Sequence, residues 1–297
     1  MKKQQIVIIG SGEIGCALGG VLRVNKNNLV DIWGRTPARG ISRKPLAALT
    51  ASADFLFLCV PSWAVKEVID GIRLQIKKDA VVVCLAKGID GKGKKTMDQV
   101  LKETLLKGQE FAILAGPMIA EELQKGMGGW GIAGVFDKKT FFKIMTIFEK
   151  TGIILGFSGD LKGAALAGVL KNIYALALGI ADGLGWGGNI KSLLVVRALE
   201  EMAGINKILG GKRETISGAA GYGDFIATSF SSYSRNRESG EDFVKTGKCC
   251  LKSEGIISLP SLVSLLSGKM DKFPLLLVLY SVIVERKNLK KAFQSLI

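Results

Sequence analysis

The sequence contains no histidine, and its five cysteines include no C-x-x-C pair. Cys16, Cys59 and Cys84 lie inside apolar runs, and Cys249 and Cys250 are direct neighbours. Closely spaced histidines and cysteines are the usual zinc ligands, and regularly spaced cysteines are typical of a disulfide framework. The sequence has neither pattern, so we expect a protein of the reducing cytoplasm that holds no metal.

Long uninterrupted apolar segments are also missing. Residues 164–181 carry Lys171 and Asn172 in their middle, and residues 274–285 are too short to cross a bilayer. The basic start, residues 1–5, precedes a short apolar run and a glycine-rich turn, which is not the order of a secretory signal. We therefore expect buried core helices and no membrane span.

Positive charge is in excess, with 41 Lys and Arg against 26 Asp and Glu, a formal net charge of +15. Such a field favours anionic ligands, nucleic acid or acidic surfaces. Aromatic residues do not alternate with the lysine clusters, however, and the clusters are scattered along the chain. They lie at residues 77–78, 92–95, 138–139 and 290–291. Lysines spread over solvated faces explain this better than a nucleic-acid site, which stays the minor alternative.

The chain of 297 residues, 48% of them hydrophobic, is long enough for two domains. In its first half, short apolar runs alternate with helical segments, which predicts parallel strands covered on both faces. We expect a doubly wound α/β domain of the Rossmann type over residues 1–158. The expected strands are residues 6–9, 29–33, 54–60, 80–85, 111–115, 131–135 and 153–157.

Strand-like runs stop after about Gly159, and longer helical segments follow. We expect an all-helical second domain over residues 159–297. No low-complexity linker separates the halves, so the first long helix is expected to pack directly on the sheet domain. The expected helices are residues 160–183, 190–208, 214–219, 240–249, 258–266 and 274–285.

A glycine-rich loop, GSGEIG at residues 10–15, follows the first strand and opens a helix. That context makes G-x-G-x-x-G a dinucleotide site, although a plain strand-to-helix turn is the alternative. Gly10 allows the tight turn, Gly12 lets the backbone approach a pyrophosphate, and Gly15 lets helix and strand pack closely. The helix N-terminus adds N–H groups and partial positive charge. Glu13 would repel a phosphate, so we expect it to face solvent or the nicotinamide side.

The end of the second strand, Gly34-Arg35-Thr36, bears on the choice of nicotinamide cofactor. NAD sites carry an acidic residue there to bind the ribose hydroxyls, and Asp31 comes two residues too early. The guanidinium of Arg35 suits a 2′-phosphate instead. We therefore expect NADP rather than NAD, with a solvated surface arginine as the alternative.

Hydride transfer to a ketone needs a proton donor beside the developing alkoxide, and without histidine the candidates are Lys, Tyr, Asp and Glu. Lys171 has helical neighbours that are mostly small or apolar, namely Ala167, Gly168, Tyr174 and Ala175. Burial on such a face lowers a lysine pKa towards the range useful for acid–base work. The alternative is a lysine that snorkels from a core helix.

Two further charged residues can support Lys171. Asp224 follows a Gly-Tyr-Gly turn and can pair with Lys171, cap a helix, or do both. Lys87 follows the fourth strand, at the sheet edge where open α/β folds bind ligands. Lys87 can reach a substrate carbonyl or phosphate there, or it is an exposed loop lysine.

A substrate phosphate needs charge-assisted hydrogen-bond donors. Ser234-Arg235-Asn236 offers a hydroxyl, a guanidinium and an amide in succession, and Asn172 can add a hydrogen bond.

Taken together, these motifs resemble the NAD(P)-dependent glycerol-3-phosphate dehydrogenases of bacterial type. The resemblance covers most of the chain and implies interconversion of dihydroxyacetone phosphate and sn-glycerol 3-phosphate, which supplies phospholipid synthesis. It also implies an active site between the Rossmann and helical domains, and a possible homodimer. It rests on the segments GSGEIGCAL, VDIWGR, ADFLFLCVPSWAVKEVI, CLAKGID, LAGPMIAEEL, GVLKNIYALALGIADGLGWGGN, GAAGYGDFIATSFSSYSRNR and SEGI.

The resemblance also implies roles for single residues. It makes Lys171 the general acid/base, with Asp224 and Lys87 beside it in the catalytic group. Substrate contacts are expected from Lys87, Gly116, Met118, Asn172, Ser234, Arg235 and Asn236. Cofactor contacts are expected from Gly10, Gly12, Glu13, Ile14, Gly15, Arg35, Lys87, Ala120, Arg235 and Glu254.

Two departures leave alternatives open. The family's GPS motif reads Gly116-Pro117-Met118 here, so a hydroxyl is replaced by a thioether, and the 36–53 segment is shorter than in the family. There are two alternatives. The first is a dehydrogenase of the same fold that acts on another phosphorylated or carboxylated ketone, and the second is a non-catalytic NADP-binding regulator.

Overall fold

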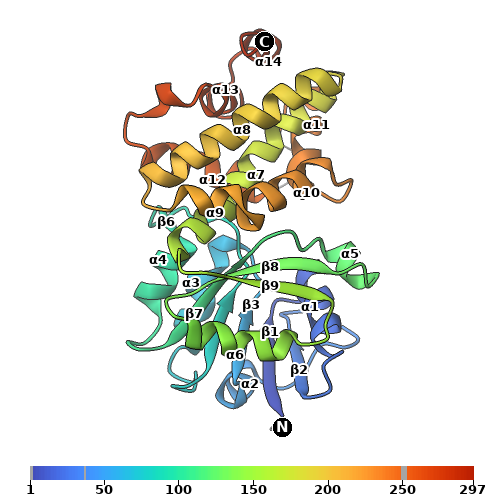
Figure 1. Cartoon of the computed structure of the whole chain (residues 1–297), viewed down its shortest axis with the longest axis vertical. Helices are drawn as coiled ribbons and strands as arrows, with labels where there is room; N and C mark the ends of the chain where they lie inside the picture. The colour runs from blue at the N-terminus through green and yellow to red at the C-terminus, as the bar shows by residue number, and fades with distance from the viewer. Residues whose placement is uncertain (1–2, 37, 249–252) are drawn as a thin grey trace.

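The computed structural model describes residues 3–36, 38–248 and 253–297. A sheet domain holds the N-terminal half of the chain, and a helical domain lies on it and carries the C-terminus at the far end (Figure 1). The predicted fold, a Rossmann-type sheet followed by a helical domain, is therefore confirmed.

The sheet has seven strands in the order β2-β1-β3-β4-β7-β8-β9. Its central strands consist of apolar residues buried on both faces, as expected of parallel strands between two layers of helices. All seven predicted strands are present, as β1 (Gln4–Ile9), β2 (Asn28–Trp33), β3 (Phe55–Leu58), β4 (Val81–Cys84), β7 (Glu110–Ala115), β8 (Gly129–Gly134) and β9 (Ile153–Ser158).

The prediction that all strands are parallel is wrong for β8, which pairs antiparallel with β7. The only helix between these strands is the short α5 (Ala120–Gln124), whereas a parallel crossover normally needs a longer connection with a full helix. The α6 helix (Lys138–Phe148) supplies such a crossover between β8 and β9, and those two strands are parallel.

Helices cover both faces of the sheet (Figure 1). Besides α5 and α6 they are α1 (Glu13–Leu22), α2 (Leu46–Ser52), α3 (Ser62–Ile72) and α4 (Met97–Thr104), and a hairpin of β5 (Ile89–Asp90) and β6 (Lys95–Thr96) lies beside α4. The helix expected after the glycine loop is α1, whereas α2 and the hairpin were not predicted. A capping box of Thr96 and Gln99 begins α4, and this T-x-x-Q pattern is legible in the sequence.

The alternation of side chains along β1 divides the core into two. Ile6 and Ile8 face the cluster that includes α1 and α6, and Val7 and Ile9 face the cluster that includes α3 and α4. The second cluster continues without a break into α7 (Leu161–Gly183) and the rest of the helical domain. The predicted direct packing of the first long helix is therefore present.

The helical domain surrounds α7, which is buried along most of its length. Asp160 caps its first turn by accepting a hydrogen bond from the Gly163 amide at 2.9 Å. Around α7 lie α8 (Gly188–Ile208), α9 (Arg213–Ser217), a π-helical turn η1 (Ala219–Gly223), α10 (Asp224–Phe230), α11 (Arg235–Thr246), α12 (Glu254–Leu265), a 3-10 turn η2 (Met270–Lys272), α13 (Pro274–Ile283) and α14 (Leu289–Gln294).

Two predicted helices begin too late. The α11 helix begins at Arg235 rather than at residue 240 because the Ser234 hydroxyl caps it, and α12 begins at Glu254 rather than at 258. The predicted end of the first, Cys249, and its neighbour Cys250 lie outside the described residues. The structure also contains α14, which was not predicted.

Of the helices in the described ranges, α7 alone is long and apolar enough to cross a membrane by length and composition, and 94% of its apolar window is buried inside the protein. Its apolar character is that of a core helix.

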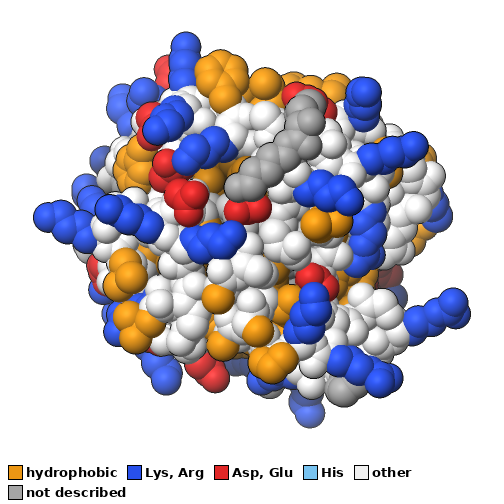
Figure 2. All heavy atoms as spheres, turned by 90° about the horizontal axis from the view of Figure 1, so that it is seen from below, with side chains coloured by type: hydrophobic (Ala, Val, Ile, Leu, Met, Phe, Trp, Pro, Cys, Tyr) orange, Lys and Arg blue, Asp and Glu red, His pale blue; other side chains and the backbone are white. Residues whose placement is uncertain are grey.

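Positive charge is dispersed on the end of the sheet domain that points away from the helical domain. Lysine and arginine side chains are spread around that face, with hydrophobic and acidic side chains between them (Figure 2).

Because α7 is the centre of the helical domain, truncating one of its core residues should lower the free energy of unfolding. Leu166 is 0% exposed, so Leu166→Ala is expected to cost about 2–5 kcal/mol through lost burial and the cavity left behind. Chemical unfolding followed by circular dichroism measures this. Leu74→Ala, at a residue 77% exposed, should change stability by less than about 0.5 kcal/mol. Equal effects of the two variants would contradict the burial of α7.

Candidate active site

The glycine loop between β1 and α1 has two glycines that the protein's own packing requires. Gly10 has φ +120°, and a Cβ there would lie 2.4 Å from the carbonyl oxygen of Cys59. A Cβ at Gly15 would lie 1.9 Å from the carbonyl oxygen of Gly10. Gly12 has no such neighbour within 4 Å. Its missing side chain leaves open space in front of the loop, which suits the close approach of a bound pyrophosphate.

The loop lies at the switch point of the sheet, because β1 has β2 on one side and β3 on the other. Gly12 is the N-cap of α1 and provides no side-chain cap, so the first N–H groups of the helix have no side-chain partner. Such an N-terminus favours an anion. The loop therefore fits a dinucleotide.

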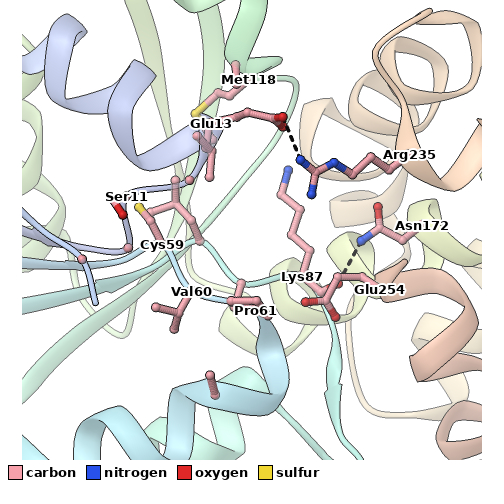
Figure 3. Close-up of a pocket in the computed structure, with 18 of the residues that line it drawn as sticks. Ser11, Glu13, Cys59, Val60, Pro61, Lys87, Met118, Asn172, Arg235 and Glu254 are labelled. Atoms are coloured by element: carbon pink, nitrogen blue, oxygen red, sulfur yellow. Dashed lines mark hydrogen bonds and ion pairs between the residues drawn. The ribbon is translucent and has the colours of Figure 1, made fainter. Parts of the chain in front are cut away.

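A cavity of about 810 Å³ extends from this loop to the helical domain. All the predicted site residues except Gly15 and Gly116 line it. From the sheet domain these are Gly10, Gly12, Glu13, Ile14, Arg35, Lys87, Met118 and Ala120, and from the helical domain Lys171, Asn172, Asp224, Ser234, Arg235, Asn236 and Glu254. Figure 3 shows how several of them face one another across the cavity.

Asp224 binds two lysines at the inner end of the cavity. Its Oδ1 lies 3.2 Å from Nζ of Lys171, and its Oδ2 accepts a hydrogen bond of 2.5 Å from Nζ of Lys87. Lys171 also donates to Oγ1 of Thr228 at 2.7 Å. The anticipated pairing of Lys171 and Asp224 is present. Asp224 begins α10 without capping it, so the capping alternative does not hold.

Burial controls the charge of this cluster. Lys171 is 9% exposed, and burial lowers its pKa to about 8, against the opposing effect of Asp224 and with help from Lys87. Burial alone would raise the pKa of Asp224, but the two ammonium groups outweigh it and lower that pKa. Lys171 can therefore lose or gain a proton near neutral pH while Asp224 stays ionised.

Two asparagines connect the halves of the site. Asn172 donates from Nδ2 to the carbonyl oxygen of Lys87 at 2.9 Å, and its Oδ1 accepts from Nδ2 of Asn236, also at 2.9 Å. The Oδ1 of Asn236 in turn accepts from the Gly255 amide at 2.9 Å. This amide chain fixes the position of the Lys87 backbone relative to α7, α11 and α12.

Glu254 makes a second connection between the domains, at the start of α12. Its carboxylate accepts hydrogen bonds from the amide of Ser62 at 2.8 Å and from its hydroxyl at 2.6 Å. Burial raises the pKa of Glu254, although both hydrogen bonds oppose the shift. Ser62 is the first residue of α3, so the carboxylate also lies at a helix N-terminus, where negative charge is favourable.

The segment Ser234-Arg235-Asn236 begins α11. The hydroxyl of Ser234 caps the helix by accepting a hydrogen bond from the Arg237 amide at 3.2 Å. Arg235 reaches over the cavity, where its Nη2 lies 2.7 Å from Oε1 of Glu13 (Figure 3). Glu13, expected to face solvent or the nicotinamide side, therefore points from the glycine loop to the helical domain.

The segment after β7 provides the wall beside Glu13. Gly116 does not line the cavity, but its carbonyl oxygen accepts a hydrogen bond of 3.2 Å from Lys87, and its φ of +102° requires a glycine. Met118 lines the cavity and is 8% exposed, since most of its side chain packs in the core. Ala120 begins α5 next to it.

The other end of the cavity lies under the short segment after β2. Arg35 is exposed at its rim, and apolar residues of two helices, Leu46, Val68 and Ile72, form the wall. Leu46, the first residue of α2, lines this end of the cavity.

Thr228 and Ser62 contact site residues but were missed from the sequence. Thr228 lies four residues after Asp224 on α10, on the same helix face, and that spacing was a usable signal. Ser62 follows Pro61 at the end of β3, and nothing in the sequence connects it to the distant Glu254. Within residues 3–36, 38–248 and 253–297, no group of three or more His, Cys, Asp or Glu side chains could hold a metal ion.

A dinucleotide loop that faces a buried lysine, held by an aspartate from a helical domain, defines a two-domain dinucleotide-dependent oxidoreductase. Comparisons of sequence identify the family. The sequence patterns of the NAD-dependent glycerol-3-phosphate dehydrogenase N-terminus and C-terminus match residues 41–140 and 160–294. The chain belongs to this family.

Relatives are similar over most or nearly all of the chain. A glycerol-3-phosphate dehydrogenase (NAD(P)+) of Fusobacterium nucleatum is 30% identical over 324 residues, covering 98% of this chain and 96% of the relative. One of Moorella thermoacetica is 35% identical over 260 residues, covering 80% and 77%. The crystal structure of glycerol-3-phosphate dehydrogenase from Coxiella burnetii has a TM-score of 0.89 at 26% identity and covers 99% of this chain and 98% of that one.

Because Asp224 pairs with Lys171, removing its carboxylate should change the pKa of Lys171. In Asp224→Asn the pKa of Lys171 should fall below about 8, because the carboxylate that raises it is gone while Lys87 still lowers it. An NMR titration of isotope-labelled lysine side chains measures the shift. Asp70→Asn, which removes a carboxylate paired at 2.7 Å with Lys66 outside the cavity, is the control. An unchanged or higher pKa of Lys171 in Asp224→Asn would show that the pair does not set it.

Proposed function

We propose that the protein catalyses the NAD(P)H-dependent reduction of dihydroxyacetone phosphate to sn-glycerol 3-phosphate and the reverse reaction. One observation carries the proposal: Lys171, with a pKa of about 8, shares a cavity with the glycine loop and with Arg235. The family, and relatives named glycerol-3-phosphate dehydrogenase (NAD(P)+), support the substrate. A cytoplasmic location, a homodimer and a domain boundary between residues 158 and 159 stay predictions.

The nicotinamide, when bound, supplies or accepts the hydride. Lys171 acts on the substrate oxygen. As an ammonium it donates a proton to the oxygen of the reduced carbonyl, and as a neutral amine it removes the proton of the alcohol. Asp224 keeps Lys171 in place, and Thr228 accepts one of its protons, which directs the remaining N–H bonds. Lys87 adds a positive charge beside the developing alkoxide.

Charge and hydrogen-bond donors at the mouth of the cavity would bind the substrate phosphate. Arg235 provides a guanidinium and Asn236 an amide from adjacent positions. The oxygen of the Ser234 hydroxyl accepts the hydrogen bond from the Arg237 amide that caps α11, and the hydroxyl still has its own proton to donate. Asn172 holds the Lys87 backbone and borders the same space.

Met118 is the observation that favours a second candidate, a dehydrogenase for another ketone. A thioether replaces the hydroxyl that the family uses for substrate, and it lines the cavity. Ketopantoate reductases share the fold alone, as in the enzyme from Ralstonia eutropha with a TM-score of 0.59 and 16% identity. Turnover rates measured on a panel of phosphorylated and carboxylated ketones distinguish the two candidates. Turnover of the carboxylated ketones alone would favour the second candidate. Cofactor binding without any turnover would indicate a regulator.

Activity should depend on Lys171. In Lys171→Ala, kcat for dihydroxyacetone phosphate reduction is expected to fall by about 100-fold or more, with NADPH affinity retained, because the proton donor is lost. Lys162→Ala is the matched control, as Lys162 is half-buried on the same helix and binds Thr96 instead. Wild-type protein that is folded yet reduces no dihydroxyacetone phosphate with NADPH or NADH would disprove the proposed function.

The pH dependence should have opposite signs in the two directions. Reduction requires the ammonium form of Lys171, so its rate should fall as the pH rises through about 8. Oxidation requires the neutral amine, so its rate should fall as the pH drops through the same value. Rates that change in the same sense in both directions would contradict the role of Lys171.

For the cofactor, we expect a preference for NADPH over NADH. Arg35 lies at the exposed rim of the cavity, beyond β2, and Gly34 leaves no carboxylate for the ribose hydroxyls. Arg35→Ala should reduce the preference by about tenfold, the loss of a charge-assisted contact of roughly 1.4 kcal/mol. The comparison of kcat/KM for the two cofactors measures it, with Arg39→Ala, an exposed arginine outside the cavity, as control. An unchanged ratio would exclude Arg35 as the reader of the 2′-phosphate.

A further inference from the structure

Glu13 puts a carboxylate at the mouth of a cavity built for phosphates. It is the first residue of α1, yet it does not cap its own helix. Its side chain crosses the cavity to Arg235 of the helical domain, with 2.7 Å between Oε1 and Nη2 (Figure 3). A favourable position for a negative charge is therefore filled by the protein itself.

Positive potential reaches this carboxylate from the guanidinium of Arg235. Glu13 is also the first residue of α1, and negative charge is favourable at a helix N-terminus. Helix N-termini and arginine forks are both common binding groups for phosphates. The carboxylate of Glu13 thus occupies a place with the chemistry of an anion site.

We propose that Glu13 is an internal competitor of the substrate phosphate for Arg235, and that it thereby tunes which anionic substrates the enzyme accepts. The proposal rests on the proposed function in taking Arg235 as the guanidinium for the phosphate. When a phosphate binds, the carboxylate of Glu13 gives up Nη2 and turns towards solvent.

Charge determines which ligands displace Glu13. A phosphate ester carries about −1.5 to −2 charges near pH 7 and three acceptor oxygens, whereas a carboxylate carries one charge and two oxygens. A phosphorylated ketone therefore gains more from Arg235 than Glu13 loses. A ketone with a single carboxylate has the same charge as the Glu13 side chain. It therefore gains no more from Arg235 than Glu13 loses. Glu13 thus favours phosphorylated over carboxylated substrates.

The test is the affinity of the full-length protein for inorganic phosphate, measured by isothermal titration calorimetry at constant ionic strength. In Glu13→Gln the dissociation constant should fall by about twofold to fivefold, because both groups are exposed and such pairs are weak. The KM for dihydroxyacetone phosphate should fall by the same factor. An unchanged or weaker phosphate affinity overturns the proposal.

Two controls separate competition from a general change of charge. Asp70→Asn removes a carboxylate of the same domain, also paired at 2.7 Å, that does not line the cavity, and it should leave phosphate affinity unchanged. In an Arg235→Gln background, Glu13→Gln should have no effect on phosphate affinity. Equal tightening in Asp70→Asn, or persistence of the effect without Arg235, overturns the proposal.

Calorimetry with phosphate needs no turnover, so the result is independent of the reaction. If the protein fails to reduce dihydroxyacetone phosphate but Glu13→Gln still tightens phosphate through Arg235, the proposed function fails and the competition stands. If the protein turns over and Glu13→Gln changes neither phosphate affinity nor KM, the competition fails and the proposed function stands.

Discussion

The carboxylate of Asp224 is shared by two ammonium groups that reach it from different halves of the chain. Lys87 comes from the end of β4 in the sheet domain, and Lys171 comes from the middle of α7. A buried charge without its partner is costly, so Asp224 stabilises the charged form of both lysines here. The cluster has two positive groups and one negative group. Lys171 is the more deeply buried of the two lysines, and its pKa of about 8 places the mobile proton on it.

The rest of the fold makes this contact possible. The apolar cluster on the α3 side of the sheet continues into α7, so the two domains share one core and cannot move far without exposing it. Glu254 on Ser62 and the chain of Asn172 and Asn236 add polar connections at the same junction. The connection between Glu13 and Arg235, by contrast, is solvent-exposed and hence easily broken. Rigidity around Lys171 is thus combined with an exposed ion pair at the mouth of the cavity.

The fold and much of the site were predictable because they depend on local patterns. Apolar runs of strand length identified the seven strands, and the glycine spacing identified the dinucleotide loop. Lys171 stood out because its helical neighbours are mostly small or apolar, which favours a position on a packed face. The direction of β8 was not predictable, because an apolar run predicts a strand without indicating whether it pairs parallel or antiparallel. Only the short connection between β7 and β8 indicates the direction of pairing. Contacts such as Glu13 with Arg235, 222 positions apart, depend on how the domains dock, which no local pattern encodes.

A crystal structure with NADP and sn-glycerol 3-phosphate tests the central claim most directly, namely that the lysine held by Asp224 acts on the substrate oxygen. The account predicts that the secondary hydroxyl of the substrate lies about 3 Å from Nζ of Lys171, with the Lys171–Asp224 ion pair kept. A hydroxyl bound away from Lys171, with the lysine contacting only Asp224 and Thr228, would contradict it.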